Sequence, residues 1–189
     1  TREFAEKVSK LKAEYKAEAT EIAKKLAQDP ALKDLISVNG KGEIVIGDLT
    51  TRPEAATLIF KALEPFLKSV KEMDVARADA MIDAVMNVFF RYKGGEFNFR
   101  PGQVEIADLL NTGKDVSAAT AAGKSMAAIR AIMKFLLMNP GKSATFAVEN
   151  PDAILKITSN QKANSGANFS HRQMLELFPR GAALVPLAT

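Results

Sequence analysis

The spacing of apolar residues at the start of the chain predicts a long amphipathic helix over residues 3–28. Apolar positions recur there at intervals of three, four and seven, while Glu and Lys residues four apart form a solvated, charged face. Asp29-Pro30 ends this helix. Two short apolar stretches, 36–38 and 43–46, are joined by Asn39-Gly40-Lys41-Gly42 and predict a small β-hairpin.

Two more helices are predicted before a pair of glycines. The first begins near Thr51 and runs to about Lys71, and the second begins near Asp74 and runs to the break before Gly94-Gly95. Phe89-Phe90 near the end of the second helix occupies positions expected to pack in a core. The glycine pair is the expected boundary between two domains, because such pairs interrupt regular structure. Residues 1–93 are therefore predicted to form a helical domain with a small hairpin, and residues 94–189 a second domain.

The second half of the chain predicts alternating helices and strands. Helices are expected over residues 103–110 and 125–137, from Pro151 onward and after Ser170, and strands over 116–119, 142–150 and 181–187. A strand, a helix and a second strand in succession imply parallel strands with a right-handed crossover. The predicted fold class is α/β, with the N-terminal helical domain followed by a parallel-sheet module.

Composition narrows the classes of protein that this chain can belong to. Hydrophobic residues make up 47% of it, which is enough for a packed core. The absence of cysteine excludes disulfides, thiolate metal sites and cysteine nucleophiles. No apolar run approaches the length of a membrane span, and the N-terminus lacks the apolar core of a signal peptide. We therefore expect no membrane partner and a cytoplasmic or virion-enclosed location. The net charge of +4 is too small to indicate nucleic-acid binding by itself.

Two short motifs carry candidate chemistry. Phe99-Arg100-Pro101-Gly102-Gln103 is followed by a stretch, residues 118–125, that ends in Gly123-Lys124-Ser125. In a phosphate-binding loop, backbone N–H groups and a lysine contact the phosphates, and a hydroxyl residue holds Mg²⁺. The start of the predicted helix 125–137 would favour an anion at the same place. The loop departs from the strict pattern because Ala118 stands where glycine is required.

The order and spacing of these motifs resemble those of superfamily 2 helicases and translocases. The resemblance is strongest to RecQ-like helicases and weaker to SecA-like motors. The resemblance covers roughly residues 96–160. It implies a partial RecA-like phosphate-loop module over residues 94–189, with ATP and Mg²⁺ as cofactors. By this resemblance Gln103 would hydrogen-bond the adenine, Lys124 would bind the β- and γ-phosphates and Ser125 would bind Mg²⁺. The predicted nucleotide site is completed by Phe99, Arg100, Thr120 and Gly123.

The sequence lacks motifs that ATP hydrolysis would need. No Asp-Glu box follows the phosphate loop, and no second RecA-like half supplies an arginine finger. Phosphate binding without a metal-orienting acid and a base for water gives little catalysis. We therefore predict no catalytic residue in this chain and expect it to bind ATP as the N-terminal part of a longer nucleic-acid-dependent motor, with nucleic acid as a partner.

A second hypothesis comes from a different class of protein. The chain is then a non-enzymatic, helical structural or packaging-associated protein, such as a phage internal component of a virion assembly, with a degenerate phosphate loop. The alanines of the loop and the missing acidic box favour this hypothesis, whereas the complete Phe99 to Gln103 motif favours nucleotide binding. The polar stretch 158–170, which includes Lys162, is expected to be a surface loop. His171, the one histidine, is expected to start a helix.

Overall fold

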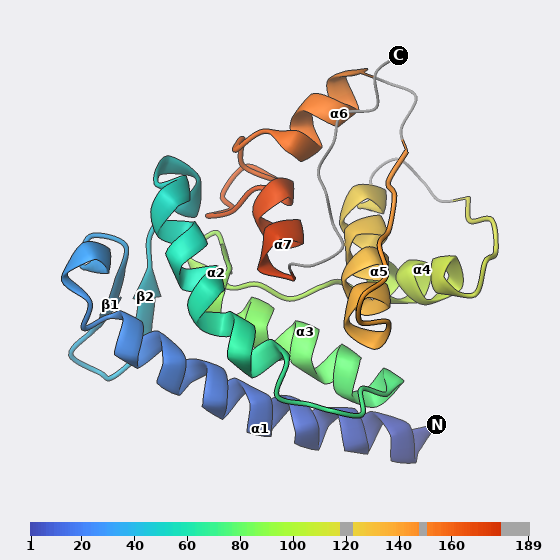
Figure 1. Ribbon diagram of the computed structural model, residues 1–189, viewed down its shortest axis with the longest axis horizontal. Helices are drawn as coiled ribbons and strands as arrows, with labels where there is room; N and C mark the ends of the chain where they lie inside the picture. Colours follow the sequence, from blue (N-terminus) through green and yellow to red (C-terminus); the bar gives the residue numbers. More distant parts are fainter. Residues whose placement is uncertain (118–122, 148–150, 179–189) are drawn as a thin grey trace.

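The protein is mainly helical. The structure is a computed structural model that describes residues 1–117, 123–147 and 151–178 (Figure 1). Of these residues, 60% are helical and 8% are in strands. The α-helices are α1 (Arg2–Leu26), α2 (Pro53–Leu67), α3 (Val75–Phe89), α4 (Pro101–Asn111), α5 (Lys124–Met138), α6 (Pro151–Thr158) and α7 (His171–Leu177). Two short 3₁₀ helices are η1 (Pro30–Leu32) and η2 (Leu49–Thr51). The strands form two antiparallel pairs, β1 (Ile36–Val38) with β2 (Ile44–Ile46) and β3 (Arg91–Tyr92) with β4 (Gly95–Glu96).

The predicted α/β fold is wrong. Within the described ranges no two strands pair in parallel, and no RecA-like sheet is present. Val116-Ser117 and residues 142–147 are not strands, and the rest of both predicted strands, together with 181–187, lies outside the described residues. Strands of a parallel sheet are buried on both faces, whereas Thr145 and Ala147 are exposed. Helix α5 instead packs its apolar side against the helices α3, α4 and α7.

Helix α1 confirms the predicted long amphipathic helix and lies along α3 (Figure 1). The Thr1 hydroxyl caps its start by accepting a hydrogen bond from the Phe4 N–H. Ala19 and Ala23 are fully buried against the rest of the protein. Because alanine ends at Cβ, these two positions let neighbouring helices approach closely. The ring of Tyr15, one helical turn earlier, lies edge-on to Phe66 of α2 with 6.0 Å between ring centroids.

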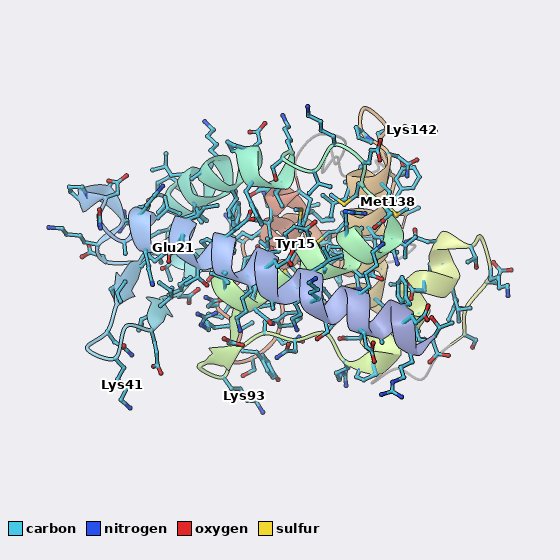
Figure 2. All side chains as sticks on the ribbon, turned by 90° about the horizontal axis from the view of Figure 1, so that it is seen from below. Tyr15, Glu21, Lys41, Lys93, Met138 and Lys142 are labelled. Carbon is cyan, nitrogen blue, oxygen red and sulfur yellow. The ribbon has the colours of Figure 1, made fainter. Side chains whose placement is uncertain are left out.

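The predicted hairpin is also confirmed, with Ile36 opposite Ile46 in the β1–β2 pair. Its turn is held by Asn39, whose Oδ1 accepts hydrogen bonds at 2.9 Å from the backbone N–H groups of Lys41 and Glu43. The second hairpin, β3–β4, turns through Lys93-Gly94, both with positive φ. Figure 2 shows Lys41 and Lys93 at the tips of the two hairpins.

The centre of the core is a group of phenylalanines from three parts of the chain. Phe90 stacks on Phe169 with 4.6 Å between ring centroids, and Phe97 lies edge-on to Phe169 at 5.2 Å. Phe60 of α2 lies edge-on to Phe90 at 6.2 Å. The expected core position of Phe89-Phe90 is confirmed, since both side chains are buried. The polar stretch before α7 was expected at the surface, yet it contributes Phe169 to the core.

Asn168 ties that stretch to the first half of the chain. Its Oδ1 accepts a hydrogen bond from the Arg91 N–H at 2.8 Å, and its Nδ2 donates to the Gly47 carbonyl at 3.1 Å. The Asn168 carbonyl accepts from the Leu49 N–H at 2.7 Å. Lys162 of the same stretch forms an ion pair at 2.9 Å with Asp48. One cluster of buried residues therefore includes members from both sides of Gly94-Gly95. The division into domains 1–93 and 94–189 stays a prediction.

Candidate functional site

The first motif builds the start of α4. Pro101 is the first residue of that helix, where its fixed φ suits a helix and its missing N–H costs nothing. Gln103 reaches back, and its Oε1 accepts a hydrogen bond at 2.9 Å from the Arg100 N–H. The Gln103 side chain is consequently buried, with 5% of the residue exposed, while Arg100 is exposed. The glutamine expected to read adenine is thus also part of the helix cap.

The second motif lies against the first. Gly123 directly precedes α5 and has φ +74° and ψ +44°, a left-handed conformation that favours glycine. Its Cα faces the side chains of Gln103 and Arg100 so closely that a Cβ at this position would collide with the Gln103 amide nitrogen and with the Arg100 guanidinium. The structure therefore brings together two predicted site segments that lie at the starts of two successive helices, α4 and α5.

The remaining predicted site residues have different outcomes. Lys124 and Ser125 are exposed on the first turn of α5, directly after Gly123. Phe99 is partly buried and packs edge-on to Phe97 with 5.0 Å between ring centroids. Thr120 lies outside the described residues. The roles proposed for these residues in binding adenine, phosphate and Mg²⁺ stay predictions.

A buried ion network joins α3, α4 and α5, and the sequence reasoning missed it. Arg130 Nη1 lies 2.7 Å from Asp83 Oδ1, and Arg130 Nη2 lies 3.3 Å from Asp79 Oδ1. Lys134 Nζ lies 3.0 Å from the same Asp79 oxygen and 2.8 Å from Asp108 Oδ1 of α4. Arg130 and Lys134 are 1% and 5% exposed. Buried charges persist when they are paired, and Asp79 is shared by both cations here.

The sequence does contain a signal for this network. Arg130 and Lys134 are four residues apart on a helix whose other neighbours at that face are apolar, and Asp79 and Asp83 have the same spacing on α3. Residues four apart share one face of a helix, so each pair presents its charges to the same side. Two complementary charged pairs on otherwise apolar helices predict helix-to-helix ion pairing.

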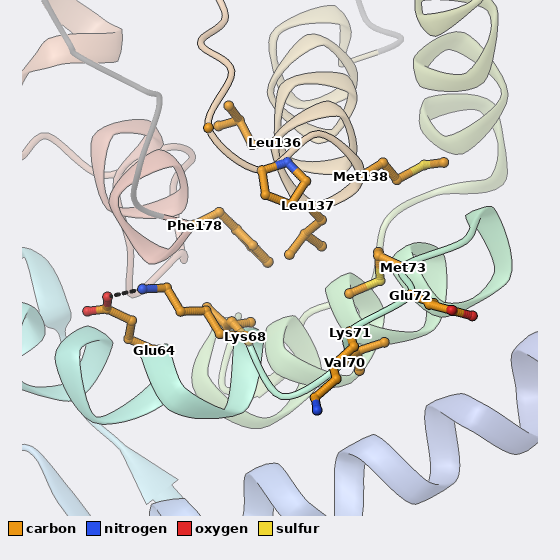
Figure 3. A pocket seen from close by; sticks show the side chains of 13 residues that line it. Glu64, Lys68, Val70, Lys71, Glu72, Met73, Leu136, Leu137, Met138 and Phe178 are labelled. Carbon is orange, nitrogen blue, oxygen red and sulfur yellow. Dashed lines mark hydrogen bonds and ion pairs between the residues drawn. The ribbon is translucent and has the colours of Figure 1, made fainter.

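An apolar cavity of about 680 Å³ lies elsewhere, between the C-terminal ends of α2 and α5 (Figure 3). Leu136 and Leu137 of α5, Val70 and Met73 of the α2–α3 connection, and Phe178 contribute to its walls. At its rim, Lys68 Nζ lies 2.8 Å from Glu64 Oε1, so these two side chains form an ion pair with each other. None of the described residues of the predicted nucleotide site lines this cavity.

His171 begins α7, as predicted, behind a Ser170 cap. The Ser170 hydroxyl accepts a hydrogen bond from the Gln173 N–H at 3.1 Å. His171 itself is 9% exposed, and its Nδ1 has no hydrogen-bond partner within the described part of the chain. Burial lowers the pKa of this imidazole below its ordinary value, and the nearby positive charge of Lys156 lowers the pKa further.

The depressed pKa of His171 predicts acid-sensitive stability. Above the ordinary histidine pKa the folded and unfolded states both hold a neutral imidazole, but as the pH falls below it the unfolded chain binds the proton first. The free energy of unfolding should therefore fall between pH 7.5 and pH 5.5, as measured by urea titration at both values. In His171→Gln most of that fall should disappear. An equal fall in both proteins would contradict the prediction.

Comparisons with protein-family models, with curated proteins and with solved structures find no match. The described helices include none that is both long enough and apolar enough to cross a membrane.

Proposed function

We propose that this chain binds ATP with Mg²⁺ where the start of α5 meets the start of α4. The observation that carries the proposal is the direct approach of Gly123 to the side chains of Gln103 and Arg100. In the resembled helicases the corresponding two motifs serve one nucleotide. Here the two motifs also meet, even though the sheet expected between them is not part of the described structure.

The local electrostatics favour a phosphate group at this place. The first N–H groups of an α-helix carry partial positive charge and point out of its N-terminus. Gly123 has no side chain with which to cap them. Lys124, and Arg100 from the facing helix start, add two exposed cationic side chains beside that end of α5. A polyphosphate placed there would meet backbone donors and both cations.

Magnesium would enter with the nucleotide. The Ser125 hydroxyl lies on the exposed first turn of α5 and supplies an oxygen ligand of the kind that Mg²⁺ prefers. Among the described residues no group of three or more His, Asp or Glu side chains is placed to hold a metal ion alone. Bound Mg²⁺ would neutralise phosphate charge. Because no Asp-Glu box follows the phosphate loop in the sequence, we propose binding and not hydrolysis by this chain alone.

The wider role that we propose is that of one part of a nucleic-acid-dependent motor whose catalytic groups come from elsewhere. This part of the proposal rests on the motif resemblance and not on the fold. The alternative role, a non-enzymatic helical structural or packaging protein, is favoured by a specific observation. Gln103 caps α4 and Phe99 packs against Phe97. Both motif residues therefore have a structural role that requires no bound nucleotide.

The test is equilibrium binding of a fluorescent ATP analogue with Mg²⁺ to the unaltered chain and to Lys124→Ala. The chain offers a matched control, because Gly141-Lys142-Ser143 repeats the same tripeptide after the C-terminal end of α5. Lys142 is exposed there and lies near Met138 at the end of that helix (Figure 2). We expect Lys124→Ala to weaken binding at least about tenfold, as for loss of a charge-assisted contact, and Lys142→Ala to leave it within about twofold.

Each outcome separates the two hypotheses. Selective weakening by Lys124→Ala, with ATP preferred over GTP, would support nucleotide binding at the start of α5. Equal weakening by both lysine substitutions would indicate nonspecific attraction to positive charge. If the folded, unaltered chain shows no binding at millimolar ATP, the nucleotide proposal fails and the structural hypothesis stands.

A further inference from the structure

Arg130 of α5 contacts Phe99, the first residue of the first motif. Its guanidinium carbon lies 4.7 Å from the centroid of the Phe99 ring, within the range of a cation–π interaction. Phe99 immediately precedes Arg100, whose N–H is held by Gln103 and whose side chain lies against Gly123. Arg130 stands two turns after Gly123 on α5. One helix therefore contacts the start of α4 at two points.

The Arg130 side chain is itself fixed in place. It is 1% exposed, and its two terminal nitrogens pair with Asp83 and Asp79 of α3. A planar guanidinium held by two carboxylates has little rotamer freedom left and presents a rigid face to the aromatic ring. Through Arg130, the position of Phe99 therefore depends on α3, a helix outside the nucleotide site.

We propose that Arg130 is a positioning residue for the nucleotide site. By holding Phe99 it holds the Arg100 and Gln103 end of α4 beside Gly123 and the phosphate-binding end of α5. This inference rests on the proposed function for its effect on ATP, but its structural half can be measured without any nucleotide. Arg130 itself is buried and does not touch the ligand in this proposal.

Lysine at position 130 is the informative substitution. Arg130→Lys keeps a positive charge between Asp79 and Asp83, so the buried carboxylates stay compensated, but a compact ammonium cannot lie flat against the Phe99 ring. Lys134→Gln is the matched control. Lys134 belongs to the same network and shares Asp79, but its ion-pair partners are Asp79 and Asp108 and not the first motif.

The first measurement is amide hydrogen exchange at Arg100, whose N–H donates a hydrogen bond to Gln103 Oε1 and is therefore expected to be protected in the unaltered protein. Without nucleotide, Arg130→Lys should lower the protection of this amide, whereas Lys134→Gln should not. The second measurement is ATP affinity at a temperature where every variant is folded. We expect Arg130→Lys to weaken ATP binding about three- to tenfold, the size of one cation–π contact, and Lys134→Gln to change it by less than about twofold.

A double-mutant cycle with Phe99→Leu closes the test. If Arg130 acts through Phe99, Arg130→Lys should have no further effect on ATP affinity in the Phe99→Leu background. Phe99 is only partly buried, so Phe99→Leu serves as the folded variant if Arg130→Lys fails to fold, and it must then lower Arg100 protection. Unchanged Arg100 protection in these variants, or equal effects of Arg130→Lys and Lys134→Gln, overturns the inference. Lost protection in a chain whose unaltered form binds no ATP would refute only the proposed function.

Discussion

Replacing Phe169 with alanine is expected to lower the free energy of unfolding by about 3–5 kcal/mol, the usual cost of removing a buried aromatic ring. Phe169 is fully buried, stacks on Phe90 and lies edge-on to Phe97. Its removal leaves a cavity where the N-terminal and C-terminal parts of the chain meet. Because small domains are stable by only about 5–15 kcal/mol, this loss should shift the urea unfolding midpoint strongly, as followed by circular dichroism.

Phe4→Ala is the matched control for this prediction. Phe4 lies on α1 and is 41% exposed, so the same change of side chain removes much less buried surface. We expect it to change the free energy of unfolding by less than about 1 kcal/mol. If Phe169→Ala were as mild as Phe4→Ala, the stretch before α7 would not be part of the core in solution.

Asp79→Asn is expected to cost about 3–5 kcal/mol of stability through electrostatics, with almost no change of shape. Asp79 is 6% exposed and lies between Arg130 and Lys134. The substitution removes the one carboxylate that both buried cations share, and the desolvation of those cations is then compensated only by Asp83 and Asp108. Urea unfolding near neutral pH measures the loss.

The same substitution at the surface provides the comparison. Asp34 faces Arg52 at 3.8 Å with 90% of its side chain exposed, and exposed ion pairs contribute little in water. Asp34→Asn should therefore change stability by less than about 0.5 kcal/mol. A mild effect of Asp79→Asn as well would mean that water reaches the network and that α3 and α5 are not locked by it.

The helices and the first hairpin could be predicted from the sequence because their signals are local. Periodic apolar positions predicted α1 to α5, and the stop at Asp29-Pro30 falls just after α1. Caps predicted from a single residue type are also present, such as Ser170 before α7. Asn39 holds the hairpin turn through contacts with residues only two and four positions away. Each of these features depends on neighbours within one or two turns of chain.

The strands predicted near Val116 and Phe146 are not present in the described residues, for the opposite reason. Short apolar runs such as those near Val116 and Phe146 fit a buried strand and an irregular segment equally well, and periodicity alone does not separate the two. A strand forms only where another strand offers a free edge. Among the described residues no strand pairs with these runs, and the helices pack mainly against one another.

The candidate site, too, was predicted only in part from the sequence. The residue types and the order of the motifs around Gln103 and Lys124 were sufficient to group them as one predicted site. That Gln103 also caps α4, and that Gly123 faces it, follows from the packing of α4 on α5. The contact of Arg130 with Phe99 needed three helices to meet, and no local pattern predicts which partners such a charge will have.

By itself the amino-acid sequence determined where the main helices begin and end, which of their faces are apolar, and which residues carry candidate phosphate chemistry. These properties depend on local hydrogen bonding and on the helical period of the side chains. Only the tertiary structure decided that the described residues around the candidate site form helices and not a parallel sheet, that Phe169 belongs to the core, and that Asp79 joins two buried cations. Burial and charge pairing between distant segments arise from the packing of the whole chain, so they become visible only when the segments are assembled.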